Sequence, residues 1–288
     1  MAAIVSSHAY HLPRAIARDV EIFAIGDIHG RPDLLQALLD QATREPRRSE
    51  RRIILFLGDL IDRGPDSLGT IDLAIDAKER IRADESTMLM GNHEAMMRLA
   101  LDTATPWDVA LDSMAAWIRN GGSAVVSQFL DPRNIPLGPE ELLTIIRVSA
   151  PSRLREWAER LEPWRRSGDV LFVHAGVNPK ERLATFLAAP WHVPLADLKQ
   201  DRHWAWVRGP FLDHRPGKKG FEGLFVVHGH TPNDKGIAPT PEEQIARFRL
   251  NLDGGSGVTG MVKMAVLRDD EAKIFTALGP TNAMLGRR

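Results

Sequence analysis

The sequence predicts an α/β fold, and three observations support this prediction. Short apolar runs typical of buried strands recur along the chain, separated by segments with helical spacing. Several of these runs end in glycine and are followed by Asp, Asn or His. Of the 288 residues, 43% are hydrophobic, which is enough to bury a large core. Together these features indicate a globular protein with polar side chains where its strands end.

Seven apolar runs are expected to form strands. In chain order they are EIFAIG (21–26), RIILFLG (52–58), TMLMG (87–91), VLFVHAG (170–176), LFVVHGH (224–230), RLNLDGG (249–255) and MVKMAVL (261–267). After the first run, leucines at 34, 35, 38 and 39 repeat at helical spacing, which predicts a helix over Pro32 to Ala42. The first 18 and the last 10 residues are expected to be peripheral.

The strand signal disappears between Ala95 and Ser167. Tryptophans at 107, 117, 157 and 164, with scattered Leu and Ile, predict a mainly helical segment there. The stretches NGG (120–122) and DPRNIPLGP (131–139) are expected to interrupt its helices. We therefore expect residues 1–288 to form a single domain, with residues 95–167 inserted in it as a helical cap.

Charge and composition exclude several classes of function. Lys and Arg total 37 against 38 for Asp and Glu, so no global basic field attracts nucleic acid or anionic lipid. The absence of cysteine excludes disulfides, thiolate metal sites and cysteine nucleophiles. There is no signal-peptide pattern, and no apolar run approaches the roughly 18 residues that span a membrane. We expect a cytoplasmic protein; the oligomeric state is left open.

Five of the predicted strands lead into polar residues of one chemical kind. The segments read G-Asp27-I-His29-G, G-Asp59-L-I-Asp62-Arg63-G, G-Asn92-His93-Glu94, His174-A-G and His228-G-His230-T. Ligands bind at the carboxyl ends of the strands in open α/β sheets. Asp, Asn and His suit Mn, Fe or Zn, and one carboxylate can bridge two such ions about 3.5–4 Å apart.

Each of these residues also has a simpler interpretation. An isolated Asp or His after a strand is more often a turn former or a helix cap. The occurrence of five such motifs together favours a metal site. We interpret the histidines outside the motifs as surface residues, namely His8, His11, His192, His203 and His214.

In chain order, the motifs GDIHG, GDLIDRG, GNHE, HAG and HGHTP resemble those of the calcineurin-like metallophosphoesterases, over Ile22 to about Leu267. The segment GDLIDRG followed by GNHE is similar to the phosphoprotein phosphatase branch. Its bacterial form is related to phage and bacterial Ser/Thr phosphatases and to symmetrical dinucleoside tetraphosphatases. The resemblance implies a four-layer α/β/β/α sandwich with a helical insertion.

The resemblance also implies a role for each motif residue. Asp27 and His29 would hold a first ion, Asp59 would bridge both ions, and the second ion would be completed by Asn92, His174 and His230. Two divalent transition-metal ions are expected, Mn²⁺ first, with Fe or Zn as alternatives.

The resemblance also implies which residues act as the general acid and which bind the phosphate. His93 would donate a proton to the leaving oxygen, with its ring oriented by Asp62. Arg63 would bind phosphate oxygens bidentately. Arg208, in WAWVRGPFL, is a further candidate phosphate ligand because bacterial relatives carry a similar W-x-R segment; the alternative is a surface arginine. The roles of His228, Asn120 and Asp253 stay open.

The implied reaction is hydrolysis of a phosphate monoester by direct attack of a hydroxide that bridges the two ions, without a covalent phosphoenzyme. We expect a protein Ser/Thr phosphatase, with phosphotyrosine also open. The alternative is a hydrolase of diadenosine tetraphosphate or a related small phosphoester, which the same metal site would serve.

Other classes of function fit the sequence less well. A nuclease-type phosphodiesterase is disfavoured because Pro232 stands where many such enzymes have a further histidine. A non-catalytic binding module is disfavoured because no ligand or acid is missing. The pattern G-x-G-x-x-G at 255–260 precedes a strand-like run instead of a helix, so it does not indicate a dinucleotide site.

Overall fold

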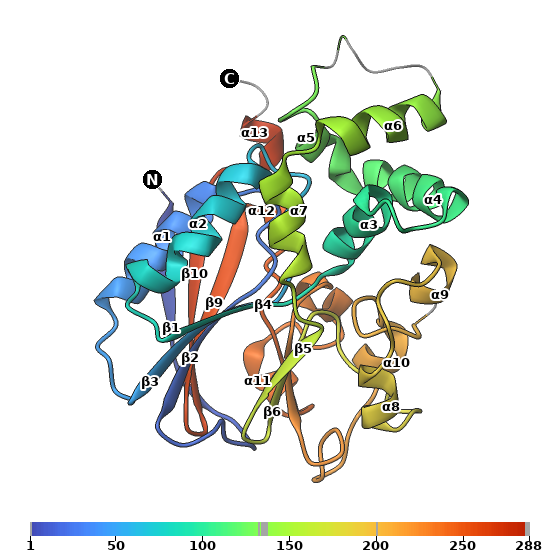
Figure 1. Cartoon of the computed structure of the whole chain (residues 1–288). Coiled ribbons are helices and arrows are strands. Elements are labelled where there is room, and N and C mark those ends of the chain that lie inside the picture. Colours follow the sequence, from blue (N-terminus) through green and yellow to red (C-terminus); the bar gives the residue numbers. More distant parts are fainter. Residues whose placement is uncertain (1, 132, 134–137, 200, 286–288) are drawn as a thin grey trace.

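The computed structural model describes residues 2–131, 133, 138–199 and 201–285, which form two β-sheets flanked by helices (Figure 1). The larger sheet has the strand order β1-β10-β9-β2-β3-β4, and the smaller has the order β5-β6-β7-β8. The larger sheet contains β1 (Ala3–His11), β2 (Val20–Ile25), β3 (Arg51–Phe56), β4 (Glu85–Met88), β9 (Met261–Arg268) and β10 (Glu271–Leu278). The smaller contains β5 (Trp164–Ser167), β6 (Val170–Val173), β7 (Phe225–His228) and β8 (Arg249–Asn251).

Each sheet has a parallel centre. Strands β2, β3 and β4 run parallel in the larger sheet, and β6, β7 and β8 run parallel in the smaller. The carboxyl ends of the two parallel sets approach each other: a Cβ placed on Gly26, after β2, would lie 2.1 Å from the carbonyl oxygen of Leu252, after β8. Loops from both sheets therefore meet at one end of the molecule.

Alternate residues of the central strands face two different apolar layers, because side chains of a strand point to opposite faces. The layer between the sheets contains Ile22, Ala24, Ile53, Leu55, Val170, Phe172, Phe225, Val227, Ala265 and Leu267. The intervening residues face outward toward helices, as Phe23 and Phe56 do in the larger sheet. Strands buried on both faces read as the continuous apolar runs that the sequence contains.

Helices cover the outer face of each sheet. Helices α1 (Pro32–Arg44) and α2 (Ser67–Arg80) lie on the larger sheet, and α1 buries the four leucines that predicted it. Helices α8 (Leu183–Leu187) and α10 (Gly209–Leu212) lie beside the smaller sheet, where the Phe211 ring packs edge-on against His228 of β7. The order of layers is α/β/β/α, so the predicted fold class is confirmed.

A group of helices between β4 and β5 stands at one end of the sandwich (Figure 1). It contains α3 (Asn92–Leu101), α4 (Trp107–Trp117), η1 (Ile118–Gly122), α5 (Ser123–Val126), α6 (Pro139–Ser149) and α7 (Ser152–Glu159). The remaining short elements are α9 (Leu195–Lys199), η3 (Pro232–Gly236), α11 (Pro241–Ile245), α12 (Ser256–Thr259) and α13 (Asn282–Leu285). That the segment 95–167 acts as a cap on a single domain stays a prediction.

The sequence did not predict three of the strands, β1, β5 and β10. The expectation that no strand occurs before Ser167 in the inserted segment is wrong, because Trp164–Ser167 forms β5. This edge strand pairs only with β6, so the sequence WRRS needs no apolar face. Strands β1 and β10 pair with each other at the edge of the larger sheet, and β1 is mostly exposed, in keeping with a peripheral position.

Within the part of the chain that the structure describes, no helix combines the length and apolarity needed to cross a membrane.

Candidate metal centre

Seven buried side chains gather where the two sets of parallel strands end. Asp27 follows β2, Asp59 follows β3, and His174 and His230 follow β6 and β7. Asn92 and His93 begin α3, and His29 lies in the loop after β2. The structure therefore brings together every motif that the sequence predicts for this edge, although the motifs lie as much as 203 residues apart.

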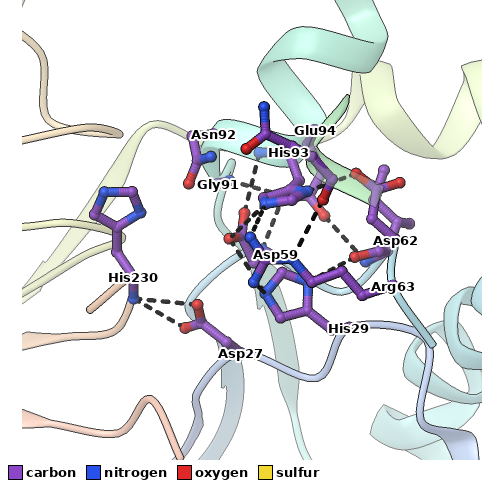
Figure 2. A network of polar contacts seen from close by, with 12 residues as sticks. Asp27, His29, Asp59, Asp62, Arg63, Gly91, Asn92, His93, Glu94 and His230 are labelled. Carbon is purple, nitrogen blue, oxygen red and sulfur yellow. Dashed lines mark hydrogen bonds and ion pairs between the residues drawn. The ribbon is translucent and has the colours of Figure 1, made fainter. Parts of the chain in front are cut away.

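Asp59 lies at the centre of this arrangement, with His29 and His93 on one side and His230 on the other (Figure 2). Its Oδ2 is 3.7 Å from Nε2 of His29 and 3.8 Å from Nε2 of His93, while its Oδ1 is 3.4 Å from Nε2 of His174. Within each of the groups His29–Asp59–His93 and Asp59–His174–His230, the possible ligand atoms lie within 4.8 Å of one another. The shared carboxylate has the placement of a bridging ligand.

The orientation of the histidines fits metal ligation. Nδ1 of His29 lies 2.9 Å from the carbonyl oxygen of Ile61, and Nδ1 of His174 lies 2.9 Å from that of Leu57. A carbonyl oxygen only accepts, so each Nδ1 carries a hydrogen, and each Nε2, which faces Asp59, is the atom that could ligate a metal. Nε2 of His230 is buried and finds no hydrogen-bond partner among the described residues. A divalent ion would satisfy these atoms.

Acceptor atoms also converge on His174. Its Nε2 lies 3.2 Å from Oδ1 of Asn92, in addition to its contact with Asp59. Burial opposes a charge here, but Asp59 outweighs it and raises the pKa of His174 to about 9. The field that favours a proton at this point also favours a metal cation.

Asp27 lies against the backbone of His230, not within either imidazole group. Both carboxylate oxygens accept the N–H of His230, at 3.1 Å each. Gly229 allows this approach, because a Cβ there would lie 2.0 Å from Oδ1 of Asp27. Burial and neighbouring Asp253 raise the pKa of Asp27 well above its ordinary value. The assignment of Asp27 to a first ion with His29 stays a prediction.

Glu94 supports the loop that carries Asp59, a role that the sequence analysis missed. Its buried carboxylate accepts the N–H groups of Asp59, Leu60 and Gly91 at 2.8, 2.9 and 3.0 Å. Burial and the charge of Asp59 raise the pKa of Glu94 to about 8. A glutamate at the third position of a helix is a known capping signal, and it could have pointed to this contact.

Several site residues adopt backbone conformations that L-residues rarely occupy. His29, Asp59, Asp62, Arg63 and His230 have φ values of 48°, 53°, 74°, 65° and 68°. Such conformations persist only where the surrounding structure holds them, and they gather at functional sites. Residues with positive φ occur elsewhere in the described chain as well, but five of them lie in the loops that present the motif side chains.

Asp62, Arg63 and His93 form a connected cluster on the His29 side of Asp59 (Figure 2). Nδ1 of His93 is 2.5 Å from Oδ2 of Asp62. The guanidinium of Arg63 lies 2.8 Å from Nε2 of His29 and 2.9 Å from Nε2 of His93. Arginine only donates, so both Nε2 atoms are acceptors in this arrangement.

Burial governs the charge of the two groups in the His93–Asp62 contact. It lowers the pKa of His93 to about 4 and raises the pKa of Asp62 well above its ordinary value. A neutral His93 then donates its Nδ1–H to Asp62 and keeps a lone pair on Nε2.

A cavity of about 490 Å³ opens next to Asp59. The predicted phosphate ligands Arg63 and Arg208 both line it, and so does Lys235, which the sequence analysis did not single out. Other lining residues include Asn120, Trp206 and His230. Asp59 and Asp201 line it too, but the three cationic side chains outnumber these carboxylates and make the cavity suitable for an anion.

The residues left open by the sequence have distinct surroundings. His228 is buried against Phe211, with Nε2 3.7 Å from Asp234, and it belongs to neither imidazole group. Asn120 lines the cavity. Asp253 is buried near Asp27, and burial raises its pKa to about 6.

The interpretation of His203 as a surface residue is wrong. Only 1% of it is exposed, and its ring packs against Trp204 of WAWVRG at a centroid distance of 4.2 Å, with the Trp206 ring farther away at 6.5 Å. The polar residues around it in the sequence concealed this local aromatic packing.

Comparison with known proteins gives one consistent result. A family model described as calcineurin-like phosphoesterase matches residues 20–259. Serine/threonine-protein phosphatase 1 of Salmonella typhimurium is 36% identical over 101 residues, which are 35% of this chain and 38% of that protein. The symmetrical bis(5'-nucleosyl)-tetraphosphatase of Pseudomonas fluorescens is 28% identical over 193 residues, which are 66% of this chain and 52% of that protein.

The alignments cover less than two thirds of either relative. Among solved structures, the cold-active protein-tyrosine phosphatase of a Shewanella species superposes with a TM-score of 0.53 at 16% identity, covering 93% of this chain and 84% of that one. This similarity supports the fold alone.

The shared position of Asp59 predicts that both metal ions depend on it. Asp59→Asn should lose most of the bound manganese, since a neutral amide cannot bridge two cations as a carboxylate does. Elemental analysis after loading with Mn²⁺ should find about two ions in the parent protein. Asp108→Asn, at an exposed acid of α4, should keep both. Full metal content in Asp59→Asn would contradict the bridging role.

Proposed function

Since the chain belongs to the calcineurin-like phosphoesterases, and is therefore a metal-dependent phosphoester hydrolase, we propose that its substrates are phosphate monoesters, principally phosphoserine and phosphothreonine in proteins. The observation that carries the proposal is the sharing of Asp59 by two imidazole groups beside a cavity lined by Arg63 and Arg208. The name of the Salmonella relative supports phosphoprotein as the substrate class. Phosphotyrosine remains within the same chemistry.

The family is dinuclear, and we propose Mn²⁺ as the preferred metal, with Fe or Zn as alternatives. Imidazole, amide and carboxylate ligands suit these ions. The proposed ligands are Asp27, His29, Asp59, Asn92, His174 and His230. When bound, two such ions make a coordinated water nucleophilic near neutral pH and neutralise charge on the phosphoryl oxygens.

Arg63 and Arg208 are proposed to bind the phosphate oxygens. Arg63 now donates to Nε2 of His29, the same lone pair that a metal would take. When His29 serves as a ligand, the Arg63 guanidinium is therefore free for the phosphate in the cavity. Arg208 is held at its backbone, where its N–H donates to Oδ1 of Asp201 at 2.6 Å.

His93 is proposed to protonate the leaving oxygen. Its Nδ1 contact with Asp62 fixes the ring, so that Nε2 points to the Arg63 side of the centre. Proton transfer requires a hydrogen on Nε2, and the contact of Nδ1 with the Asp62 carboxylate would stabilise the ring in that protonated form.

Hydrolysis of dinucleoside polyphosphates is the second candidate function. It is favoured by Lys235, a third cation on the cavity with Arg63 and Arg208. A polyphosphate chain carries several anionic groups, so it would use all three cations, whereas a monoester needs fewer. The similarity to a symmetrical tetraphosphatase over 66% of the chain supports the same candidate.

We also propose that the protein acts in the cytoplasm and has no nucleic-acid or membrane partner. The near balance of 37 basic and 38 acidic residues supports the absence of such partners, because binding to phosphate backbones or anionic lipids depends on clustered positive charge. Its partners would then be phosphorylated proteins or small phosphoesters.

Direct attack by solvent oxygen predicts the stereochemistry of the reaction. One in-line displacement inverts the configuration at phosphorus, whereas a phosphorylated His93 or Asp62 would give two inversions and net retention. A chiral phosphorothioate ester hydrolysed in isotopically labelled water should therefore show inversion. Net retention, or a phosphoprotein trapped by acid quench, would exclude direct attack.

The acid role of His93 predicts a dependence on the leaving group. His93→Asn should retain both metals and lower kcat for alkyl phosphates by roughly 10²- to 10⁴-fold, which is typical for loss of proton transfer. The loss should be much smaller for p-nitrophenyl phosphate, whose leaving group needs no proton. Equal losses across a series of esters would indicate a binding or structural role instead.

A substrate panel with Lys235→Ala separates the two candidate functions. The parent protein should hydrolyse phosphoserine and phosphothreonine peptides with a higher kcat/KM than diadenosine tetraphosphate. Lys235→Ala should raise KM for the dinucleotide by about tenfold, the usual effect of one charged hydrogen bond, and leave the peptides nearly unchanged. Lys218→Ala, at an exposed lysine outside the cavity, is the control. Preference for the dinucleotide would favour the second function.

A further inference from the structure

We propose that Trp117 is a positioning residue for the Asp62–His93 pair, so that the helical segment between β4 and β5 takes part in the reaction. This inference rests on the proposed function, in which His93 donates the proton. Trp117 is the last residue of α4, and neither the metal groups nor the cavity contains it.

The indole N–H of Trp117 points at the carboxylate that holds His93. Nε1 donates to Oδ1 of Asp62 at 2.8 Å and to Oδ2 at 3.0 Å. Oδ2 also accepts Nδ1–H of His93 at 2.5 Å. All three side chains are buried, so no competing solvent screens these hydrogen bonds. The carboxylate is therefore held between a rigid donor on one side and the catalytic imidazole on the other.

The backbone N–H of Asp62 donates to Oγ of Ser67 at 2.9 Å, but the orientation of the carboxylate depends on contacts of the side chain. The φ of Asp62, 74°, lies in the left-handed region, which persists only when the surroundings impose it. A buried carboxylate without donors would also be costly. Trp117 supplies a donor and, being planar and packed, restricts rotation of the carboxylate. Rotation would tilt the His93 ring, and proton transfer depends strongly on such geometry.

The glycines after Trp117 fit this arrangement. Gly122 has φ −63° and ψ −20°, a conformation open to any residue, yet a Cβ there would lie 2.5 Å from Nε1 of Trp117. Space for the indole, not backbone freedom, therefore requires glycine at this position. The NGG stretch does more than interrupt helices: it leaves room for the ring that contacts Asp62.

The same stretch holds Arg63. The carbonyl oxygen of Gly121 accepts the backbone N–H of Arg63 at 3.1 Å, and that of Asn120 accepts its Nε–H at 3.3 Å. A Cβ on Gly121 would lie 2.7 Å from Cγ of Arg63. These contacts come from η1, whose backbone is kinked at Gly121, with φ 112° and ψ 5°. One short segment thus supports both neighbouring residues, Asp62 and Arg63.

The test is Trp117→Phe, which keeps an aromatic ring and removes the N–H. We expect kcat for alkyl phosphates to fall about tenfold, with KM and metal content unchanged and little effect on p-nitrophenyl phosphate. The matched control is Trp157→Phe in α7. This indole is also buried, but its Nε1 contacts Sδ of Met88 at 3.1 Å instead of Asp62. The control variant should change neither the rate nor its dependence on the leaving group.

Gly122→Ala provides a second route to the same displacement. The added methyl group must push the indole away from Asp62. Gly122→Ala should therefore show the leaving-group dependence expected of Trp117→Phe, and it tests the proposal even if Trp117→Phe folds poorly. Equal losses for all esters in both variants, or full activity in both, would overturn the proposal.

A double-mutant cycle shows whether Trp117 acts through Asp62. Added to Asp62→Asn, the change Trp117→Phe should lower kcat no further, because the carboxylate that it positions is gone. Additive losses would overturn the proposal. If His93→Asn showed no leaving-group dependence, the acid role in the proposed function would fail, yet non-additivity of Trp117 and Asp62 would still support positioning.

Discussion

The buried carboxylate of Asp59 is the constraint on which the site depends. Burial alone would raise its pKa, but His174, His93 and His29 surround it and hold that pKa well below its ordinary value. Its two oxygens face different imidazole groups, and its backbone N–H donates to Glu94. An ionised carboxylate in such a place requires compensating charge, which explains why so many polar side chains converge on it.

The two-sheet sandwich makes this convergence possible. Its packed centre fixes the carboxyl ends of β2, β3, β6 and β7, and short loops beyond them carry five of the motif residues in left-handed conformations. Strain of this kind costs roughly 1–3 kcal/mol per residue, and only a rigid framework can sustain several such residues together. Glycines at 91 and 229 then let carboxylates lie directly against backbone.

The chemistry and the choice of substrate are supported by different parts of the chain. Residues at the strand ends form the centre that phosphomonoesters and dinucleoside polyphosphates would share. Arg208 and Lys235, from the loops beside the smaller sheet, line the cavity outside that centre. Trp117 and the turn after it reach in from the helical segment and touch Asp62 and Arg63. Divergence in these outer parts would alter substrate preference without changing the metal ligands.

The sequence by itself determined the fold class, seven of the ten strands in the described residues, and the polar residues that follow them. These features are local: an apolar run, a glycine and a following Asp or His are neighbours in the chain. Strands β1, β5 and β10, the burial of His203 and the contacts of Glu94, Trp117 and Lys235 were decided only by the tertiary structure. Trp117 meets Asp62 across 55 residues, and no local pattern specifies such a contact, because it depends on how separately formed elements pack.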